Sequence, residues 1–292
     1  MQGIGIGISD FKMLRLRNNY FIDKSMYIKD IIDNQSGVVL ITRPRRFGKT
    51  LNMSMLRYYF DIKEKNNKEL FNGLKIMEQD EYYTSKLGYY PVIYLTLKDV
   101  NDVSHDKMIL DLKTAMINMY KEHMYLLDSN KIYDFEKQKI QDILYAREDE
   151  VLLKNAVKDL SEYLNRYYER PVILLIDEYD VPIQAAYVEG YYEDAIKFLK
   201  TFYGTTFKDN PYLEKAILTG VSRIAKESLF SGMNNFKVYT IMDNEFADDF
   251  GITEDEMKKI IKDFNIQDEE KEIKKWYDGY KIGNVEGIYN PW

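Results

Sequence analysis

A glycine, a lysine and a threonine stand together at residues 48–50, and side chains in this order can hold a phosphate. The sequence Arg43-Pro44-Arg45-Arg46-Phe47-Gly48-Lys49-Thr50 ends like the pattern G-x-x-x-x-G-K-[ST], but arginine stands where the first glycine is expected. In such a loop the lysine ammonium reaches the β- and γ-phosphates, and the threonine hydroxyl is a ligand of Mg²⁺. Three common residues can match by chance, so the flanking segments must be considered.

The flanking segments favour phosphate binding. An apolar run at residues 37–41 precedes the loop, and a segment with helical spacing begins at Leu51. The loop is therefore predicted at a strand-to-helix turn, where unpaired N–H groups and the positive end of the helix dipole attract anions. The candidate nucleotide-binding residues are Arg43, Pro44, Arg45, Arg46, Phe47, Gly48, Lys49, Thr50 and Leu51. Only Gly48 has the backbone freedom of glycine, and Pro44 fixes its own φ, so the entrance to the loop should be stiff.

Two carboxylates follow a second apolar run. Residues 171–180 read PVILLIDEYD, so Asp177 falls at the carboxyl end of a predicted strand, where open α/β sheets bind ligands. Asp177, with Thr50, is the candidate ligand of Mg²⁺, and Glu178 is the candidate general base for an attacking water. The alternative is that both acids only end a buried strand. Their combination with the Gly-Lys-Thr loop favours the catalytic interpretation.

A third run ends in polar residues. Residues 216–223 read AILTGVSR, and Thr219 is expected to contact the γ-phosphate or the attacking water. Arg223 could stabilise charge on the transferred phosphoryl group, or it could be a surface or ion-pair residue. Thr219 and Arg223 join Glu178 as the candidate catalytic residues.

The elements that would position these residues alternate along the chain. Buried parallel strands are predicted at 38–42, 92–97, 172–177, 215–219 and 237–242. Helices are predicted at 49–61, 106–125, 151–168 and 191–208, which gives an α/β fold. Two amphipathic helices, 252–265 and 268–277, are expected to form a small C-terminal helical appendage, and the glycines of the tail, 279–287, are typical of a hairpin. The predicted domains are an N-terminal segment, 1–36, an ATPase core, 37–245, with a helical insertion at about 100–168, and the appendage, 246–292.

Composition narrows the function classes. The 292 residues are 45% hydrophobic and 30% charged, which is typical of a folded globular protein. There are no cysteines and two histidines, which excludes thiolate chemistry and disfavours imidazole chemistry. The net charge of −7 disfavours nucleic-acid coating through overall charge, although Arg45 and Arg46 could serve either nucleotide or a nucleic acid strand. No apolar run reaches the ~20 residues of a membrane span, and the opening MQGIGIGISD lacks the basic and apolar regions of a signal peptide, so a cytoplasmic location is expected.

The motifs together resemble a known family. The runs FIDKS at 21–25, RPRRFGKT at 43–50, LIDEYD at 175–180 and LTGVSR at 218–223 stand in the order found in the bacterial AAA-ATPase-like family. That family's loop typically reads R-P-R-R-F-G-K-T, which accounts for Arg43. The resemblance implies ATP and Mg²⁺ binding through Walker A and Walker B motifs on an additional-strand P-loop fold, with the sheet order 5-1-4-3-2.

The resemblance also implies an effector. Members commonly carry a C-terminal PD-(D/E)XK nuclease-superfamily domain, and the present sequence ends where that domain would begin, so the domain is expected to be absent. Nucleic acid is therefore a possible partner through that missing domain. Three hypotheses remain: an Mg²⁺-dependent ATPase coupled to an effector, an ATP-dependent binding switch with negligible turnover, and a scaffold whose site has decayed. The presence of Lys49, Thr50, Asp177 and Glu178 argues against decay.

Overall fold

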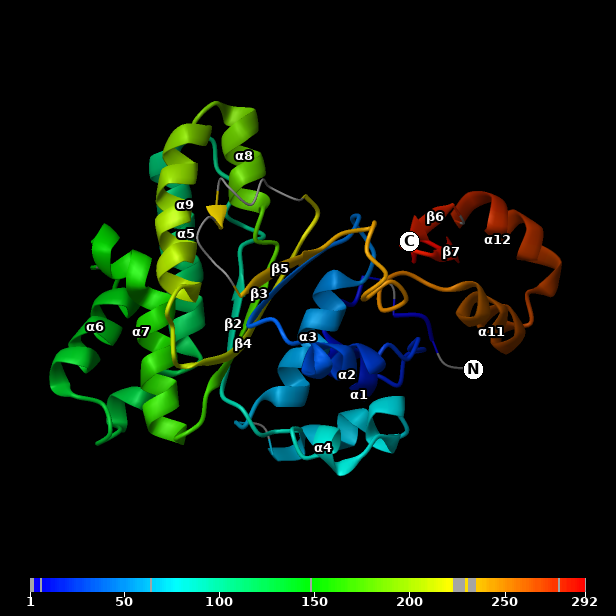
Figure 1. Cartoon of the computed structure of the whole chain (residues 1–292), viewed down its shortest axis with the longest axis horizontal. Helices are drawn as coiled ribbons and strands as arrows, with labels where there is room; N and C mark the ends of the chain where they lie inside the picture. The colour runs from blue at the N-terminus through cyan, green and yellow to red at the C-terminus, as the bar shows by residue number, and fades with distance from the viewer. Residues whose placement is uncertain are drawn as a thin grey trace. The chain divides into compact units, whose positions relative to one another are not determined.

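A five-stranded, mostly parallel sheet flanked by helices organises the chain (Figure 1). The computed structural model describes residues 3–5, 7–63, 65–147, 149–222, 229–230, 235–277 and 279–291. The strands are β1 (Val38–Thr42), β2 (Val92–Thr96), β3 (Val172–Asp177), β4 (Leu213–Gly220) and β5 (Phe236–Tyr239), and their order is β2-β3-β4-β1-β5. This is the order 5-1-4-3-2 read from the other edge, so the predicted α/β P-loop fold is confirmed.

The strands form where the sequence has continuous apolar runs. Every residue of β1 and β3 is buried, as expected for strands covered on both faces. β2 pairs in parallel with β3, and β3 pairs in parallel with β4. β5 ends at Tyr239, three residues earlier than predicted, because the backbone N–H and the hydroxyl of Thr240 both donate to the carboxylate of Asp243. That local turn ends the strand.

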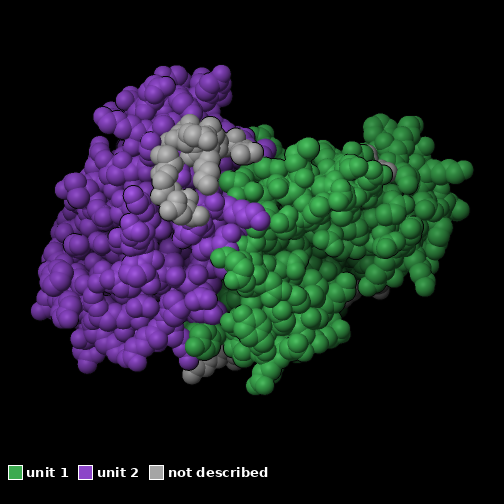
Figure 2. Space-filling model, in the orientation of Figure 1, with its two compact units in different colours: residues 1–35, 41–89, 238–292 green, residues 36–40, 90–237 purple. Residues whose placement is uncertain are grey.

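Two compact units divide the chain (Figure 2). Unit 1 contains residues 1–35, 41–89 and 238–292, and unit 2 contains residues 36–40 and 90–237. The α-helices of unit 1 before its last segment are α1 (Phe11–Leu16), α2 (Met26–Asp33), α3 (Lys49–Phe60) and α4 (Glu81–Thr84), with 3₁₀ turns at Lys65–Phe71 and Lys75–Glu78. The α-helices of unit 2 are α5 (His105–Lys121), α6 (Asp134–Leu144), α7 (Glu150–Tyr168), α8 (Val181–Glu189) and α9 (Tyr192–Phe207), with a 3₁₀ turn at Met124–Asp128. The predicted domain boundaries at residues 37 and 246 stay a prediction.

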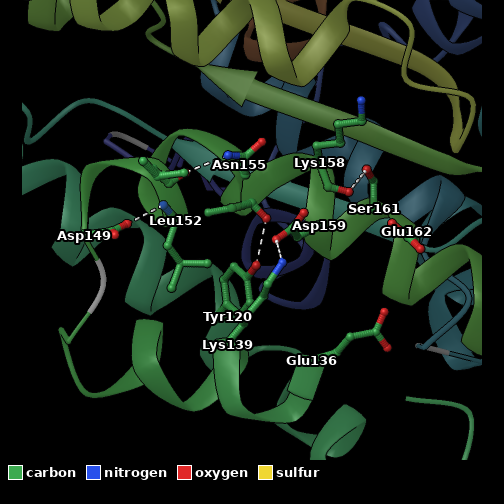
Figure 3. Close-up of polar contacts among 12 residues, drawn as sticks. Tyr120, Glu136, Lys139, Asp149, Leu152, Asn155, Lys158, Asp159, Ser161 and Glu162 are labelled. Carbon is green, nitrogen blue, oxygen red and sulfur yellow. Dashed lines mark hydrogen bonds and ion pairs between the residues drawn. The ribbon is translucent and has the colours of Figure 1, made fainter. Parts of the chain in front are cut away.

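Polar contacts tie the helices of unit 2 together. Helix α7 packs against both α5 and α9 (Figure 1), and α6 packs on α5 and α7. The buried Tyr120 hydroxyl of α5 donates to the Ala156 carbonyl of α7 at 2.8 Å, and Lys139 of α6 reaches Asp159 at 3.1 Å (Figure 3). Asp149 caps α7 by accepting the N–H of Leu152. The segment predicted as a helical insertion thus supports β2 and β3.

The C-terminal segment differs from the expected helical appendage. Helices α11 (Glu254–Phe264) and α12 (Glu270–Tyr277) are present, with a 3₁₀ turn at Gln267–Glu269, but the antiparallel strands β6 (Tyr280–Ile282) and β7 (Val285–Ile288) follow them. The two-residue turn between these strands uses Gly283 at φ +55°, and a side chain there would collide with Asn244 and the Asp243 backbone. Ile282 and Ile288 are buried, which fixes the register of the two strands. The two predicted helices are present, but the description of this segment as a helical appendage was wrong in one respect, because the segment ends in a small antiparallel sheet.

Membrane insertion through a helix finds no support in the structure. Across the residues that the structure describes, no helix combines the length and the apolar composition needed to cross a membrane.

Candidate nucleotide site

The predicted phosphate loop leads directly into α3 in unit 1. Gly48 is the N-cap residue, with φ +79°, a left-handed conformation that glycine adopts without strain. A Cβ added at Gly48 would meet no atom within 4 Å, so a ligand could approach the backbone closely at this point. The first N–H groups of α3 have no partner within the helix, which is the arrangement that binds phosphate oxygens.

Lys49 points back into the loop. Its ammonium donates to the carbonyl of Arg43 at 3.0 Å and to that of Pro44 at 2.8 Å, and the residue is only 7% exposed. The carbonyls are neutral, so a phosphate would compete with them strongly for the ammonium. Thr50 and Leu51 follow on the first turn of α3, and both are partly exposed.

Arg43, at the first-glycine position, turns its side chain into the interior of unit 1. The guanidinium donates to the carbonyls of Thr42 and Phe246, at 2.9 and 2.8 Å, and lies over the Phe250 ring at 5.4 Å. Burial lowers the pKa of Arg43 to about 10, opposed by the charge of Asp249, so the side chain stays positive at neutral pH. The backbone carbonyl of Arg43 therefore contacts Lys49, and the guanidinium of Arg43 anchors the loop to residues 245–250.

The middle of the loop is exposed at its arginines and buried at its phenylalanine. Arg45 and Arg46 are exposed, and Arg46 has φ +69°, an uncommon conformation for a residue other than glycine. Phe47 is buried against Tyr280 of β6, with ring centroids 4.8 Å apart, and its carbonyl accepts the N–H of Gly251. The C-terminal strands thus help to fix the loop backbone.

A buried carboxyl group accompanies Arg43. Asp249 is 4% exposed, one of its oxygens has no hydrogen-bond partner, and it is hydrogen-bonded to Asp30. Burial and the charges of Asp30 and Asp248 raise the pKa of Asp249 well above its usual range, against the opposing charges of Lys24 and Arg43. Sequence analysis did not single out this residue, since the run Asp248-Asp249 reads as ordinary solvated acids.

The raised pKa of Asp249 predicts how stability depends on pH. The folded protein keeps a proton that the unfolded chain releases near pH 4, so the free energy of unfolding should fall as pH rises through the folded-state pKa. Asp249→Asn keeps a neutral hydrogen-bond donor toward Asp30 and should be more stable than wild type at pH 8 by about 1 kcal/mol or more. Urea unfolding between pH 5 and 8 measures this. Asp268→Asn, at an exposed aspartate of the 3₁₀ turn Gln267–Glu269, is the control, and an unchanged pH slope in Asp249→Asn would contradict the prediction.

The predicted carboxylates lie in unit 2, at the end of β3. Asp177 is buried, and its carboxylate accepts a hydrogen bond of 2.6 Å from the hydroxyl of Thr219 on β4. The structure thus brings together two predicted site residues that are 42 positions apart. Glu178 is partly exposed and has φ +56°, a strained conformation for glutamate that is common at functional sites. Arg223 lies outside the described residues.

The N-terminal segment Tyr20–Tyr27 precedes β1. Its sequence leaves two roles open, a cover over the adenine or a plain surface connection. The Tyr20 hydroxyl donates to Asp263 at 2.8 Å, and its ring lies 5.0 Å from that of Phe264, both on α11. Burial and the hydrogen bond to Asp263 raise the pKa of Tyr20 to about 12. These contacts give Tyr20 a packing role.

A magnesium ion would need most of its ligands from outside the protein. Within the described ranges, no group of three or more histidine, cysteine, aspartate or glutamate residues gathers as a metal site. Mg²⁺ commonly takes one or two protein oxygens and completes its shell with phosphate and water. Each of the two predicted ligands, the hydroxyl of Thr50 in unit 1 and the carboxylate of Asp177 in unit 2, carries the oxygen chemistry that Mg²⁺ prefers, and their joint use stays a prediction.

Comparisons with known proteins identify the family of the chain. The sequence model of a family described as "Predicted AAA-ATPase" matches residues 5–230. The chain belongs to this family. Membership in the predicted AAA-ATPase family supports ATP binding, and it confirms the resemblance seen in the motifs.

A curated relative is longer than this chain. An uncharacterised protein from the vnfD 5′ region of Azotobacter chroococcum mcd 1 is 26% identical over 288 residues, which is 98% of this chain and 50% of the relative. The chain thus spans about half the length of the curated relative it matches. No solved structure matches the chain.

Proposed function

We propose that the chain binds Mg²⁺-ATP and hydrolyses it, and that turnover acts on an effector region or partner. The observation that carries this proposal is the Lys49 ammonium, held inside a loop that opens α3 by two carbonyls that a phosphate could replace. Within the proposal, the loop from Arg43 to Leu51 holds the phosphates. Arg45 and Arg46 are exposed, and the proposal gives them the role of adding positive charge there.

In this proposal, oxygen atoms of the protein bind the metal ion and activate the attacking water. Thr50 and Asp177 would bind the Mg²⁺, which supplies charge neutralisation for the phosphates. Thr219 keeps the Asp177 carboxylate oriented through the hydrogen bond of 2.6 Å. Glu178, partly exposed beside them, would accept the proton of the attacking water. Arg223 is proposed to contact the transferred phosphoryl group.

The effector is part of the proposal as well. A nuclease-like domain following this region is suggested by the family resemblance, and the chain covers half of its curated relative. Such a domain or a separate partner would respond to the state of the nucleotide. A cytoplasmic location is proposed with it.

Glu178→Gln should abolish phosphate release while leaving ATP affinity within about twofold of wild type. The amide keeps the size of the side chain but cannot accept the proton of water, and general bases contribute about 10²- to 10⁴-fold. Phosphate release by the purified chain with Mg²⁺ measures turnover, and calorimetry measures binding. Glu193→Gln, at an exposed glutamate of α9, is the matched control.

The same experiment distinguishes the two functional hypotheses. Release by wild type that is lost in Glu178→Gln supports the ATPase. ATP binding by both proteins with no release by either would support a nucleotide-dependent binding switch. Equal release by both proteins would remove Glu178 from the proposed chemistry.

A further inference from the structure

Asp180 is a buried acid next to the proposed catalytic residues, with no part in the chemistry described above. It is the N-cap residue of α8 and is 1% exposed. An N-cap aspartate usually accepts an N–H of its own helix. The side chain of Asp180 makes no such bond, and Pro182 in the first turn lacks an N–H. The carboxylate is therefore committed elsewhere.

The carboxylate binds the backbone that follows β4. One oxygen, Oδ2, accepts the N–H groups of Val221 at 3.0 Å and Ser222 at 2.7 Å. It also accepts the side-chain amide of Gln184 at 2.6 Å, and the same amide donates to the Ser222 hydroxyl at 3.1 Å. Successive backbone N–H groups that converge in this way bind anions, and hydrogen bonds to an ionised group are stronger than neutral ones.

Tyr179 holds the same segment from the other side. Its backbone N–H donates to the Thr219 carbonyl at 3.0 Å, and its hydroxyl donates to the Ser222 carbonyl at 2.7 Å. The Tyr203 hydroxyl in turn donates to the Tyr179 carbonyl at 2.9 Å. Residues 219–222 are thus fixed to residues 177–180 at both ends.

Gly220 lies where the two segments approach most closely. A Cβ at this position would come within 2.5 Å of Asp180 Oδ1 and 2.6 Å of the Tyr179 ring. Asp180 Oδ1 has no hydrogen-bond partner. Burying a carboxylate with one oxygen unpaired costs free energy of folding, which the hydrogen bonds of the other oxygen must offset. We infer that Asp180 is buried here because it holds residues 219–222 in position.

We propose that Asp180 is a positioning residue for ATP hydrolysis, an inference that rests on the proposed function. By holding Val221 and Ser222, it fixes the end of β4 so that the Thr219 hydroxyl stays bonded to Asp177. It also fixes the turn that contains Glu178, which lies between Asp177 and Asp180 in a left-handed conformation. Loss of the Asp180 carboxylate should misplace the base and the threonine without removing either.

Asp180→Asn and Asp180→Ala test this role. Asparagine keeps one oxygen acceptor but loses the charge, and alanine loses the acceptor. We expect kcat to fall roughly tenfold in the first and 100-fold in the second, with the dissociation constant for ATP within about twofold of wild type. Asp194→Asn, at an exposed aspartate of α9, is the matched control and should leave all values unchanged.

Hydrogen exchange supplies a readout independent of turnover. The amides of Val221 and Ser222 should exchange faster in Asp180→Asn and fastest in Asp180→Ala, measured below the unfolding transition. Unchanged exchange in both variants would overturn the contact, whatever the kinetics. Faster exchange with an unchanged kcat would overturn the positioning role and leave Asp180 a structural residue. No phosphate release by wild type would instead overturn the proposed function, and with it the kinetic role of Asp180.

Discussion

Lys49→Ala should lose measurable ATP binding. The Lys49 ammonium is held inside the phosphate loop by the carbonyls of Arg43 and Pro44, and it is the group best placed to pair with the β- and γ-phosphates. A charge-assisted contact to phosphate is among the strongest hydrogen bonds a protein makes. We therefore expect the dissociation constant to rise at least about 100-fold, which corresponds to roughly 3 kcal/mol.

Calorimetry and thermal unfolding with added ATP and Mg²⁺ measure the loss. A ligand at about 100 times its dissociation constant stabilises the folded state by about 2.7 kcal/mol, so wild type should unfold at a higher temperature with nucleotide and Lys49→Ala should not. Lys121→Ala, at an exposed lysine at the end of α5, is the control. An affinity in Lys49→Ala equal to that of wild type would show that the loop does not bind the phosphates.

The strands could be predicted from the sequence because they are buried on both faces. Burial of every residue in β1 and β3 requires the uninterrupted apolar runs that were recognised. The order of the strands came from the family resemblance, since parallel strands are paired by contacts distant in sequence. The strands β6 and β7 were indicated only by the hairpin-like glycines of residues 279–287, because the strands have only three and four residues, with charged side chains at Lys281 and Glu286.

The candidate site was predictable in its residue types and less so in its contacts. The Gly-Lys-Thr loop and the pair of carboxylates have recognisable spacing, and hydrogen bonding of Thr219 to Asp177 agrees with their placement at strand ends. Asp180 has no such signal, because its partners Val221 and Ser222 are about 40 residues away and contribute only backbone groups. Nearly every residue has the same backbone donor and acceptor, so the sequence does not show which of them a side chain will bind.

Arg43→Gly should destabilise the protein, although glycine is the usual residue at that position of a phosphate loop. The guanidinium is the donor to the carbonyls of Thr42 and Phe246, and it is 1% exposed. Its removal leaves buried acceptors without partners and takes a positive charge away from Asp249. We expect the free energy of unfolding to fall by about 2–4 kcal/mol.

Urea unfolding at pH 7 measures this loss, and Arg45→Gly is the control that separates the side chain from the backbone. Both variants add a flexible glycine to the same loop, which costs about 0.5–1 kcal/mol through the unfolded chain. Arg45 is exposed, so its variant should show little beyond that cost. Equal losses in the two variants would mean that glycine itself is the cause. A larger loss in Arg43→Gly means that arginine stands in place of glycine here because the carbonyls of residues 245–250 need its donors. It also means that contacts within unit 1 hold the loop in shape before any phosphate binds.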